Sequence, residues 1–446
     1  MRRQVLVSII LCVTACYLGW PQAAGAVEWI NCNDPYYRTL DLAPVGAGPL
    51  ELAKVTCQRV QADFQQIAMV SPDGGSIMYL QGGGDYTAER KVLYTARLDA
   101  RDGWSSYALN MGALWQFGRA GRSVPAYGWA SDSSGIWTAT REKIGAGGIA
   151  GSGLQPLFIS LKDGSTRLFD PPRHKAGPLD GLLWAGGDGL ALAYFGARGA
   201  SYQPQRDDKH PTFAIIDAKR GVVLDTLPFD VFERLKDAYY IANVNNAAAT
   251  RLQNGKVRVV LSALDQWVVW TQGEPPRILP NPYPDPQEGN NKMTISRDGS
   301  RLLVARLHCD GGRLGYDDIR QYNVQRGHVS PPCKPVQGII AALFDLDTGR
   351  QLWDVRVTVP RLDFYPNPAI SEDGRFALVG LPYDGPGPHA QIALISMDDG
   401  TIVQRFRSPG PGALNSIGFL RGDRGVWVRS DSDGVTSLYD LRASAR

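Results

Sequence analysis

Residues 308–337 hold the densest group of candidate functional side chains in the sequence. The group consists of His308, Asp310, Tyr316, Asp317 and Asp318, and Cys309 and Cys333 frame it. Carboxylate and imidazole groups are ligands for divalent cations, but this spacing matches no established ligand pattern. We therefore predict a cysteine-framed loop that recognises a partner or protects the rim of the fold, and no metal site.

Sequence motifs for catalysis and cofactor binding are absent. The chain contains no H-E-x-x-H, G-x-S-x-G, P-loop or C-x-x-C-H pattern. Residues 145–150 match G-x-G-x-x-A, but a strand pattern follows where a dinucleotide site needs a helix. The residues therefore predict no catalytic group and no cofactor.

The N-terminal 26 residues resemble an export signal. Two arginines precede an apolar run at 4–18, which is too short for a membrane span, and Ala24-Gly25-Ala26 supplies an A-x-A cleavage site. This pattern predicts a signal peptide over 1–26 with cleavage near Ala26, and a periplasmic or secreted protein. Residues 13–16 also fit a lipobox, so a lipoprotein anchored at Cys16 is the alternative. The arginine pair leaves the export route, general secretory or twin-arginine, open.

Four cysteines remain after this cleavage. They are Cys32, Cys57, Cys309 and Cys333. An even number of cysteines in an exported protein predicts two disulfides, for which three pairings are possible. The local pairing, Cys32–Cys57 and Cys309–Cys333, closes loops of about 25 residues and needs no long-range contact.

Composition excludes several classes of protein. The 446 residues include 47 Lys and Arg against 44 Asp and Glu, a balance that gives no strong field to attract nucleic acid. The 43% hydrophobic content is enough to build a core, which argues against disorder. Beyond the N-terminal run no apolar stretch reaches membrane length, so we expect no membrane span in the mature chain.

The rest of the chain repeats a pattern of apolar strand, S-x-D-G turn and apolar strand. Clear copies lie at 71–74, 296–299 and 371–374, and 132–135 is a more divergent one. Asp and Gly suit such turns because one or two central residues take positive φ. A second hairpin, such as 343–355, follows each copy, so each unit is predicted to be four antiparallel strands.

Seven such units are expected. Their first strands should start near residues 65, 125, 180, 247, 291, 365 and 414. The last unit supplies only three strands, and the mature N-terminus near 37–42 is expected to add the fourth. The predicted fold is therefore an all-β, seven-bladed β-propeller in a single domain over 27–446, with 308–337 inserted in the fifth blade and the ring closed by an N-terminal strand joining the last blade. Most of the recurring tryptophans should pack between blades.

The S-x-D-G turns and D-x-x-x-G hairpins such as 345–349 resemble the WD40-like, YVTN and PD40 propeller repeats of exported bacterial proteins. The resemblance covers almost the whole mature chain, although the Gly-His and Trp-Asp signature of strict WD40 repeats is absent. It implies the propeller fold. It implies little about activity, because the family includes scaffolds, binding modules, dehydrogenase subunits and some hydrolases.

The two faces of the predicted propeller differ. The first and third connections of each unit are minimal turns, whereas the second and fourth are long, as at 142–154 and 196–210. Binding residues gather on loops that a rigid scaffold holds in place. We therefore expect a binding site on the long loops, formed by Trp115, Tyr202, His210, His308, Asp310, Tyr316, Asp317 and Asp318.

Two functions from different classes fit these observations. The first is a non-catalytic propeller that binds a protein partner or a small ligand in the cell envelope through its long loops. The alternative is an enzyme or enzyme subunit, of the dehydrogenase or hydrolase type, with a site at the axial mouth. The missing motifs favour the first.

Overall fold

The computed structural model describes the strands and short turns of the chain. The described residues are 42–46, 48–59, 67–81, 90–97, 105–110, 128–140, 153–195, 212–228, 231, 244–263, 266–282, 292–309, 336–359, 367–381, 389–411, 414–430 and 435–443. No helix among them is long and apolar enough to cross a membrane. The expected signal peptide lies outside these residues.

Nearly all of the described chain is β-strand, arranged in antiparallel sheets that we number in chain order. Sheet 1 contains β3 (Ile67–Val70), β4 (Ser76–Gln81), β5 (Arg90–Arg97) and β6 (Ser105–Asn110). Sheet 2 contains β7 (Gly128–Trp129), β8 (Gly135–Thr140), β9 (Gln155–Ser160) and β10 (Thr166–Leu168). Sheet 3 contains β11 (Leu179–Ala185), β12 (Leu190–Phe195), β13 (Thr212–Asp217) and β14 (Val222–Pro228).

The next two sheets follow the same order. Sheet 4 contains β15 (Val244–Arg251), β16 (Val257–Ala263), β17 (Gln266–Thr271) and β18 (Arg277–Pro280). Sheet 5 contains β19 (Lys292–Ile295), β20 (Arg301–Cys309), β21 (Val336–Asp345) and β22 (Gln351–Val359). In sheets 1 to 5 each strand pairs with the next strand of the chain, as the repeated hairpins predict.

The last two sheets each recruit a strand from the N-terminal part of the chain. Sheet 6 contains β23 (Ala369–Ile370), β24 (Phe376–Gly380), β25 (His389–Ser396) and β26 (Ile402–Pro411), with β1 (Ala43–Pro44) beside β26 as a fifth strand. Sheet 7 contains β27 (Leu414–Phe419), a 3-10 turn (Arg421–Asp423), β28 (Gly425–Ser430) and β29 (Val435–Ala443), with β2 (Leu50–Arg59) on the outer side of β29.

The strand that completes sheet 7 lies further along the chain than the sequence pattern suggested. The expected segment near 37–42 lies almost entirely outside the described residues, and β2 pairs with β29 instead. The period-2 pattern of β2 explains this, because Leu50 and Leu52 pack against the core while Glu51 between them is exposed.

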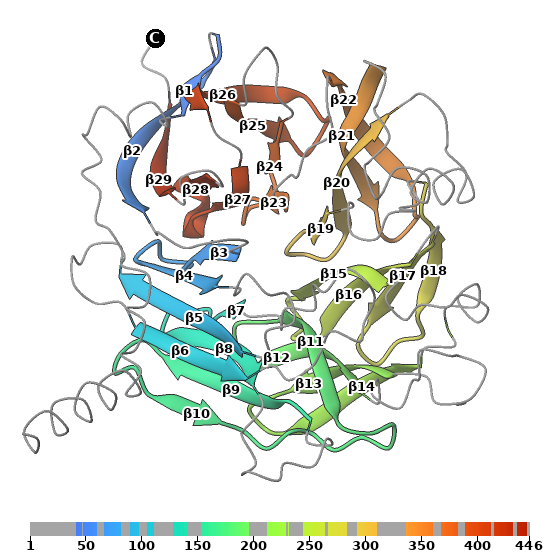
Figure 1. Ribbon diagram of the computed structural model, residues 1–446. Coiled ribbons are helices and arrows are strands. Elements are labelled where there is room, and N and C mark those ends of the chain that lie inside the picture. Colours follow the sequence, from blue (N-terminus) through green and yellow to red (C-terminus); the bar gives the residue numbers. More distant parts are fainter. Residues whose placement is uncertain are drawn as a thin grey trace, which may run out of the picture.

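The sheets lie around a common centre (Figure 1), with the first strand of each sheet inward and the last outward. Their cores lie between neighbouring sheets. In β13, Phe213 and Ile215 pack toward sheet 4, whereas Ala214 and Ile216 pack toward sheet 2. Because successive side chains in a strand point to opposite faces, sheets 3 to 6 each contribute buried residues to two core clusters, one on either face.

Tryptophans pack between neighbouring sheets, as expected. Trp267 of sheet 4 meets Phe344 of sheet 5 edge to face, with ring centroids 4.6 Å apart. Trp270 donates its indole N–H to Asp225 of sheet 3 at 3.1 Å, and Trp353 donates to the carbonyl of Met397 in sheet 6 at 3.1 Å. Each indole ring thus buries apolar surface at one junction between sheets. Trp270 and Trp353 also each make a hydrogen bond across their junction.

Candidate functional site

Alternation of strand direction divides the connections between two faces. We call the face that holds the first and third connections of each sheet the turn face, and the opposite one the loop face. The described residues cover the turn face well, including the first turns of all seven sheets. Most of the loop face lies outside them.

The predicted site residues belong, by sequence, to the second and fourth connections, and their side chains lie outside the described part of the structure. This holds for Trp115, Tyr202, His210, Asp310, Tyr316, Asp317 and Asp318. The backbone of His308 lies in β20 and pairs with Ile339, and nothing is described of its side chain. The grouping of these residues into one site therefore stays a prediction.

The structure describes the positions of only two of the four cysteines predicted to form disulfides. Cys57 lies in β2 opposite Ser437, and Cys309 ends β20 opposite Gly338. Cys32 and Cys333 lie outside the described residues. The two predicted disulfides stay predictions.

The S-x-D-G turns share one hydrogen-bond pattern. In the turn of sheet 1, the Ser71 hydroxyl donates to Asp73 Oδ1 at 2.6 Å and accepts the Ser76 amide at 2.8 Å. The same carboxylate oxygen accepts the amide of Gly75 at 2.9 Å. The turns that begin at Ser296 and Ser371 repeat these three bonds. The glycine of the motif has φ near +75° in each case, which explains its presence.

These hydrogen bonds stabilise the charged form of the turn carboxylates. Burial alone would raise the pKa of Asp73, but hydrogen bonds from the Ser71 hydroxyl and the Gly75 amide outweigh it and leave the pKa below its usual value. The pKa of Asp298 and that of Asp373 are lowered in the same way. The turn carboxylates are therefore ionised acceptors, which makes them poor proton donors.

The first turns of neighbouring sheets are linked by a continuous series of polar contacts, which we call the turn belt. From sheet 1 to sheet 4 the contacts are Asp73 N–H to Ser133 Oγ (3.1 Å), Ser131 Oγ to Asp188 (3.0 Å) and the ion pair of Arg251 with Asp188. From sheet 4 to sheet 6 they are Arg258 to the Gly299 carbonyl (2.9 Å) and the ion pair of Arg297 with Glu372.

The turn of sheet 7 completes the belt on both of its sides. Asp423 accepts the amides of Glu372 and Asp373 of sheet 6, at 2.6 and 2.9 Å. Toward sheet 1, the Arg421 amide donates to the Pro72 carbonyl at 2.8 Å, and the Arg424 guanidinium donates to the carbonyl of Asp73. Hydrogen bonds therefore cross all seven junctions between neighbouring sheets.

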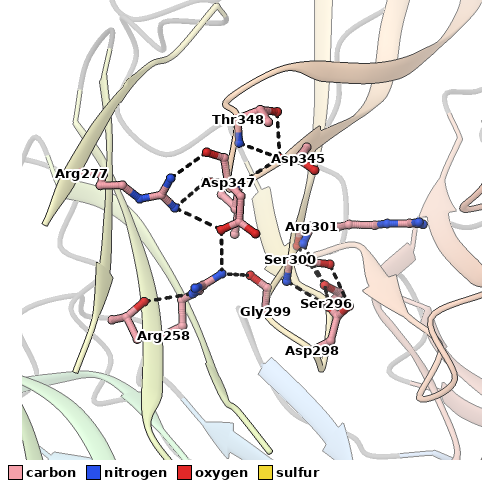
Figure 2. Close-up of polar contacts among 12 residues, drawn as sticks. Arg258, Arg277, Ser296, Asp298, Gly299, Ser300, Arg301, Asp345, Asp347 and Thr348 are labelled. Carbon is pink, nitrogen blue, oxygen red and sulfur yellow. Dashed lines mark hydrogen bonds and ion pairs between the residues drawn. The ribbon is translucent and has the colours of Figure 1, made fainter. Parts of the chain in front are cut away.

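The junction of sheets 4 and 5 has the densest contacts of the turn face (Figure 2). Arg277 donates to the backbone carbonyls of Leu346 and Asp347, each at 2.8 Å. Arg258 donates to Thr271 Oγ1 at 3.0 Å as well as to Gly299. Both guanidinium groups lie 3.4 Å from the Asp347 carboxylate, so two arginines of sheet 4 hold one turn of sheet 5.

The polar groups of the turn belt bind one another and so join neighbouring sheets. Among its contacts, the Asp188 carboxylate pairs with Arg251 and that of Glu372 with Arg297, while the Asp423 carboxylate accepts two backbone amides. The belt contains no histidine or cysteine, and no cluster of metal-ligating side chains occurs among the described residues. These groups contact one another across the junctions between sheets.

Sequence reasoning did not find the turn belt, although one signal was present. Arg297 and Glu372 occupy the second position of successive S-x-D-G turns and carry opposite charges. Complementary charges at one position of consecutive repeats indicate a contact between the repeats.

One part of the loop face is fully described, namely the connection 169–178 from β10 to β11. It contains His174, whose ring packs against Phe195 at the end of β12, with ring centroids 5.1 Å apart. The Ala176 amide donates to His174 Nδ1 at 3.1 Å. Burial, with a contribution from the charge of Lys175, lowers the pKa of His174 below its usual 6.5.

The fold and these turns together define a protein of the β-propeller class. No protein-family model matches the sequence, and no curated protein is similar to it. Solved structures with a similar fold include the β-propeller domain of Cps50 (Swd1) from Myceliophteria thermophila, at 9% identity and a TM-score of 0.45, over 87% of this chain and 99% of that one.

Two further structures are of the same kind. The C-terminal WD40 domain of Sif2 is 13% identical with a TM-score of 0.41, over 90% of this chain and 100% of that one. TolB from Acinetobacter baumannii is 12% identical with a TM-score of 0.37, over 76% of this chain and 65% of that one. At this distance the comparisons concern the fold and carry no information on function.

Proposed function

We propose that the protein is an exported, seven-bladed β-propeller that binds a protein or small ligand of the cell envelope through its loop face. The seven sheets are the blades, and β2 closes the ring by joining β29. Two observations support closure: β2 aligns with β29 over nine residue pairs, and the turn belt crosses every junction, including that between sheets 7 and 1.

The observation that carries the binding function is the difference between the two faces. On the turn face, the first turns make polar contacts with the neighbouring sheet at every junction. On the loop face most connections are longer than strand pairing requires, although two residues suffice between β16 and β17 and between β26 and β27, and ordering a longer connection costs conformational entropy. A rigid ring with elaborated loops on one side is suited to recognition on that side.

The residues proposed to contact the partner belong to different loops. Asp310, Tyr316, Asp317 and Asp318 lie in the insertion with His308 at its start, and Trp115, Tyr202 and His210 lie in other loops of the same face. They combine aromatic rings with ionisable groups, a composition that fits a specific polar ligand or a protein surface.

A paired substitution experiment tests this assignment. In one variant a Gly/Ser linker replaces 310–321, and in the other Lys256→Gln and Glu274→Gln remove an exposed ion pair of the turn face. Tagged mature protein is used to recover partners from the native envelope fraction. A partner retained by the wild type and the turn-face variant, and lost by the loop variant of equal melting temperature, supports the proposal. Binding that survives loop replacement but is lost in the turn-face variant contradicts it.

Export and disulfide formation are tested on protein from the native cells. N-terminal sequencing should find Val27 if the signal peptide is cleaved after Ala26, whereas a lipidated Cys16 would identify the anchored alternative. Thiol titration of denatured, unreduced protein should find no free cysteine. Peptide mapping should link Cys32 to Cys57 and Cys309 to Cys333, and free thiols would contradict the assignment.

A further inference from the structure

The connection 169–178 is held against the ring at several points. Its first residue, Phe169, donates its amide to the Pro156 carbonyl at 2.9 Å, and Leu154 donates to the Leu179 carbonyl at 2.6 Å just beyond its end. Between these anchors the side chain of Ala176 packs on the core cluster that contains Phe195. The connection therefore covers the loop-face end of sheets 2 and 3.

His174 closes a tight turn within this connection. The Gly177 amide donates to the His174 carbonyl at 3.2 Å, and the Ala176 amide donates to Nδ1 of the same residue at 3.1 Å. An accepting Nδ1 places the imidazole proton on Nε2. The bond from the amide two residues ahead is the one that Asn or Asp makes in an Asx turn.

This geometry needs a neutral imidazole. Protonation would place a hydrogen on Nδ1, so that two N–H donors would face each other at a separation of 3.1 Å. One proton therefore weakens the turn that holds the imidazole ring beside Phe195.

We propose that the connection 169–178 is a pH-sensitive element of the loop face, in which protonation of His174 opens the turn and releases the connection from Phe195. The inference goes beyond the proposed binding function and does not depend on the identity of the partner. Its consequence is that mildly acidic conditions expose apolar surface at the loop-face ends of sheets 2 and 3.

The surroundings of His174 favour the neutral form. Lys175, on the same connection, is the charged group that acts on it among the described residues, and a positive neighbour opposes a second positive charge. The packed strand β12 contributes the Phe195 ring, while the adjacent Tyr194 lies against Gly181. Because the pKa of His174 is lowered in the folded protein, the contact is complete above pH 6.5 and is lost as the pH falls through the folded-state pKa.

Amide hydrogen exchange of the mature protein tests the proposal. Protection of the peptide covering 173–178, corrected for the intrinsic pH dependence of exchange, is compared at about pH 7.5 and about pH 5. Acidification should lower protection of this peptide roughly fivefold, the effect of losing one hydrogen bond, while peptides of β13 and β17 keep theirs.

Two variants separate the contributions of His174. In His174→Asn the side-chain oxygen can accept the same amide but cannot titrate, so protection should be independent of pH. In His174→Phe the ring can still pack on Phe195 but accepts no hydrogen bond, so protection should be low at both pH values. Unchanged protection in the wild type, or an equal acid response in His174→Asn, would overturn the proposal.

If a variant does not fold, a second measurement on the wild type tests whether His174 titrates as proposed. Imidazole nitrogen shifts of wild-type protein labelled at histidine report the tautomer and the midpoint of each ring. The proposal is supported if one imidazole ring carries its proton on Nε2 at neutral pH and titrates with a midpoint below pH 6.5. That midpoint should match the pH at which protection of 173–178 is lost. A midpoint at or above 6.5 for every ring contradicts it.

Discussion

At the scale of single residues, the turns combine a glycine of positive φ with a carboxylate that accepts several N–H or O–H groups. Gly374 and Gly400 have φ of +73° and +75°, so the backbone requirement is the same at both. Their surroundings differ. A Cβ added to Gly374 would meet nothing within 4 Å, whereas one added to Gly400 would lie 2.8 Å from the ring of Trp353.

This pair provides a matched test of packing between sheets. Gly374→Ala should lower the free energy of unfolding by about 1 kcal/mol, the cost of positive φ. Gly400→Ala carries the same cost and should lose roughly a further 1–3 kcal/mol, because Trp353 must move. Urea unfolding of both variants measures the difference. Equal losses would show that Trp353 is not held against this turn.

The carboxylate of Asp163 allows a test of the turn hydrogen bonds by pH. The Ser165 hydroxyl and amide donate to it at 2.7 and 3.0 Å, and they lower the pKa of Asp163 from 3.8 to about 2. Because the folded-state pKa is depressed, its contribution to stability is present above pH 3.8 and is lost as the pH falls to about 2.

The measurement is the titration of the Asp163 carboxyl carbon by NMR in the wild type and in Ser165→Ala. Removal of the hydroxyl, the largest contribution, should move the pKa of Asp163 back toward 3.8. A pKa that does not change would mean that the hydroxyl does not face the carboxylate in solution.

At the scale of elements, the junctions between sheets depend on groups with very different exposure. The side chain of Arg258 is 16% exposed, that of Arg277 is 43% exposed and that of Arg251 is 50% exposed. A charged hydrogen bond contributes more where water is excluded, because an exposed pair competes with solvent and salt. The three arginines should therefore contribute unequally to stability.

Substitution of each arginine by Met tests this order, since Met keeps much of the apolar volume. Arg258→Met should lower the free energy of unfolding by about 2 kcal/mol, because the Gly299 carbonyl and Thr271 hydroxyl lose their donor. Arg277→Met should cost about 1 kcal/mol and Arg251→Met about 0.5 kcal/mol or less. Urea unfolding at low and high salt gives these values. If Arg251→Met cost the most stability and Arg258→Met the least, the exposed ion pairs would contribute most to holding the sheets together.

At the scale of the whole molecule, the N-terminal part of the chain contacts the C-terminal sheets in three ways. The Leu42 amide donates to the Tyr439 hydroxyl at 3.3 Å, β1 pairs with β26, and β2 pairs with β29. In Figure 1 the blue strands β1 and β2 lie beside the red strands of sheets 6 and 7. Two segments from the start of the chain thus complete two successive sheets at its end.

A series of truncations measures what each contact contributes. Under reducing conditions, deletion of 27–41 should cost little, because β1 and β2 remain. Deletion of 27–46 also removes Leu42 and β1 and should cost about 1–2 kcal/mol. Deletion of 27–59 removes β2, leaves β29 as an open sheet edge and should cost on the order of 5 kcal/mol.

Thermal unfolding and urea titration of the three truncations give the comparison. If the deletion of 27–59 costs no more than that of 27–46, β2 does not close the ring. If both are as stable as the full mature chain, the N-terminal segment plays no part in closure.

The sequence by itself determined the repeating unit and its boundaries. The first strands begin at Ile67, Gly128, Leu179, Val244, Lys292, Ala369 and Leu414, within a few residues of the expected positions. These features are local, because hairpin turns depend on Asp and Gly at fixed offsets and strands depend on nearby apolar residues. The function could not be predicted from these motifs because an S-x-D-G turn specifies a hairpin but does not specify a ligand.

Only the tertiary structure decided which distant segments meet. The choice of Leu50–Arg59 for the outer strand of sheet 7, β1 on sheet 6, the turn belt and the contact of His174 with Phe195 each join groups far apart in the chain or on different elements. Such pairings depend on how the sheets lie relative to one another, and the alternating pattern of a strand such as β2 does not identify the sheet edge that it joins. A carboxylate in a turn is thus a local signal, whereas the arginine that it contacts depends on how the sheets pack together.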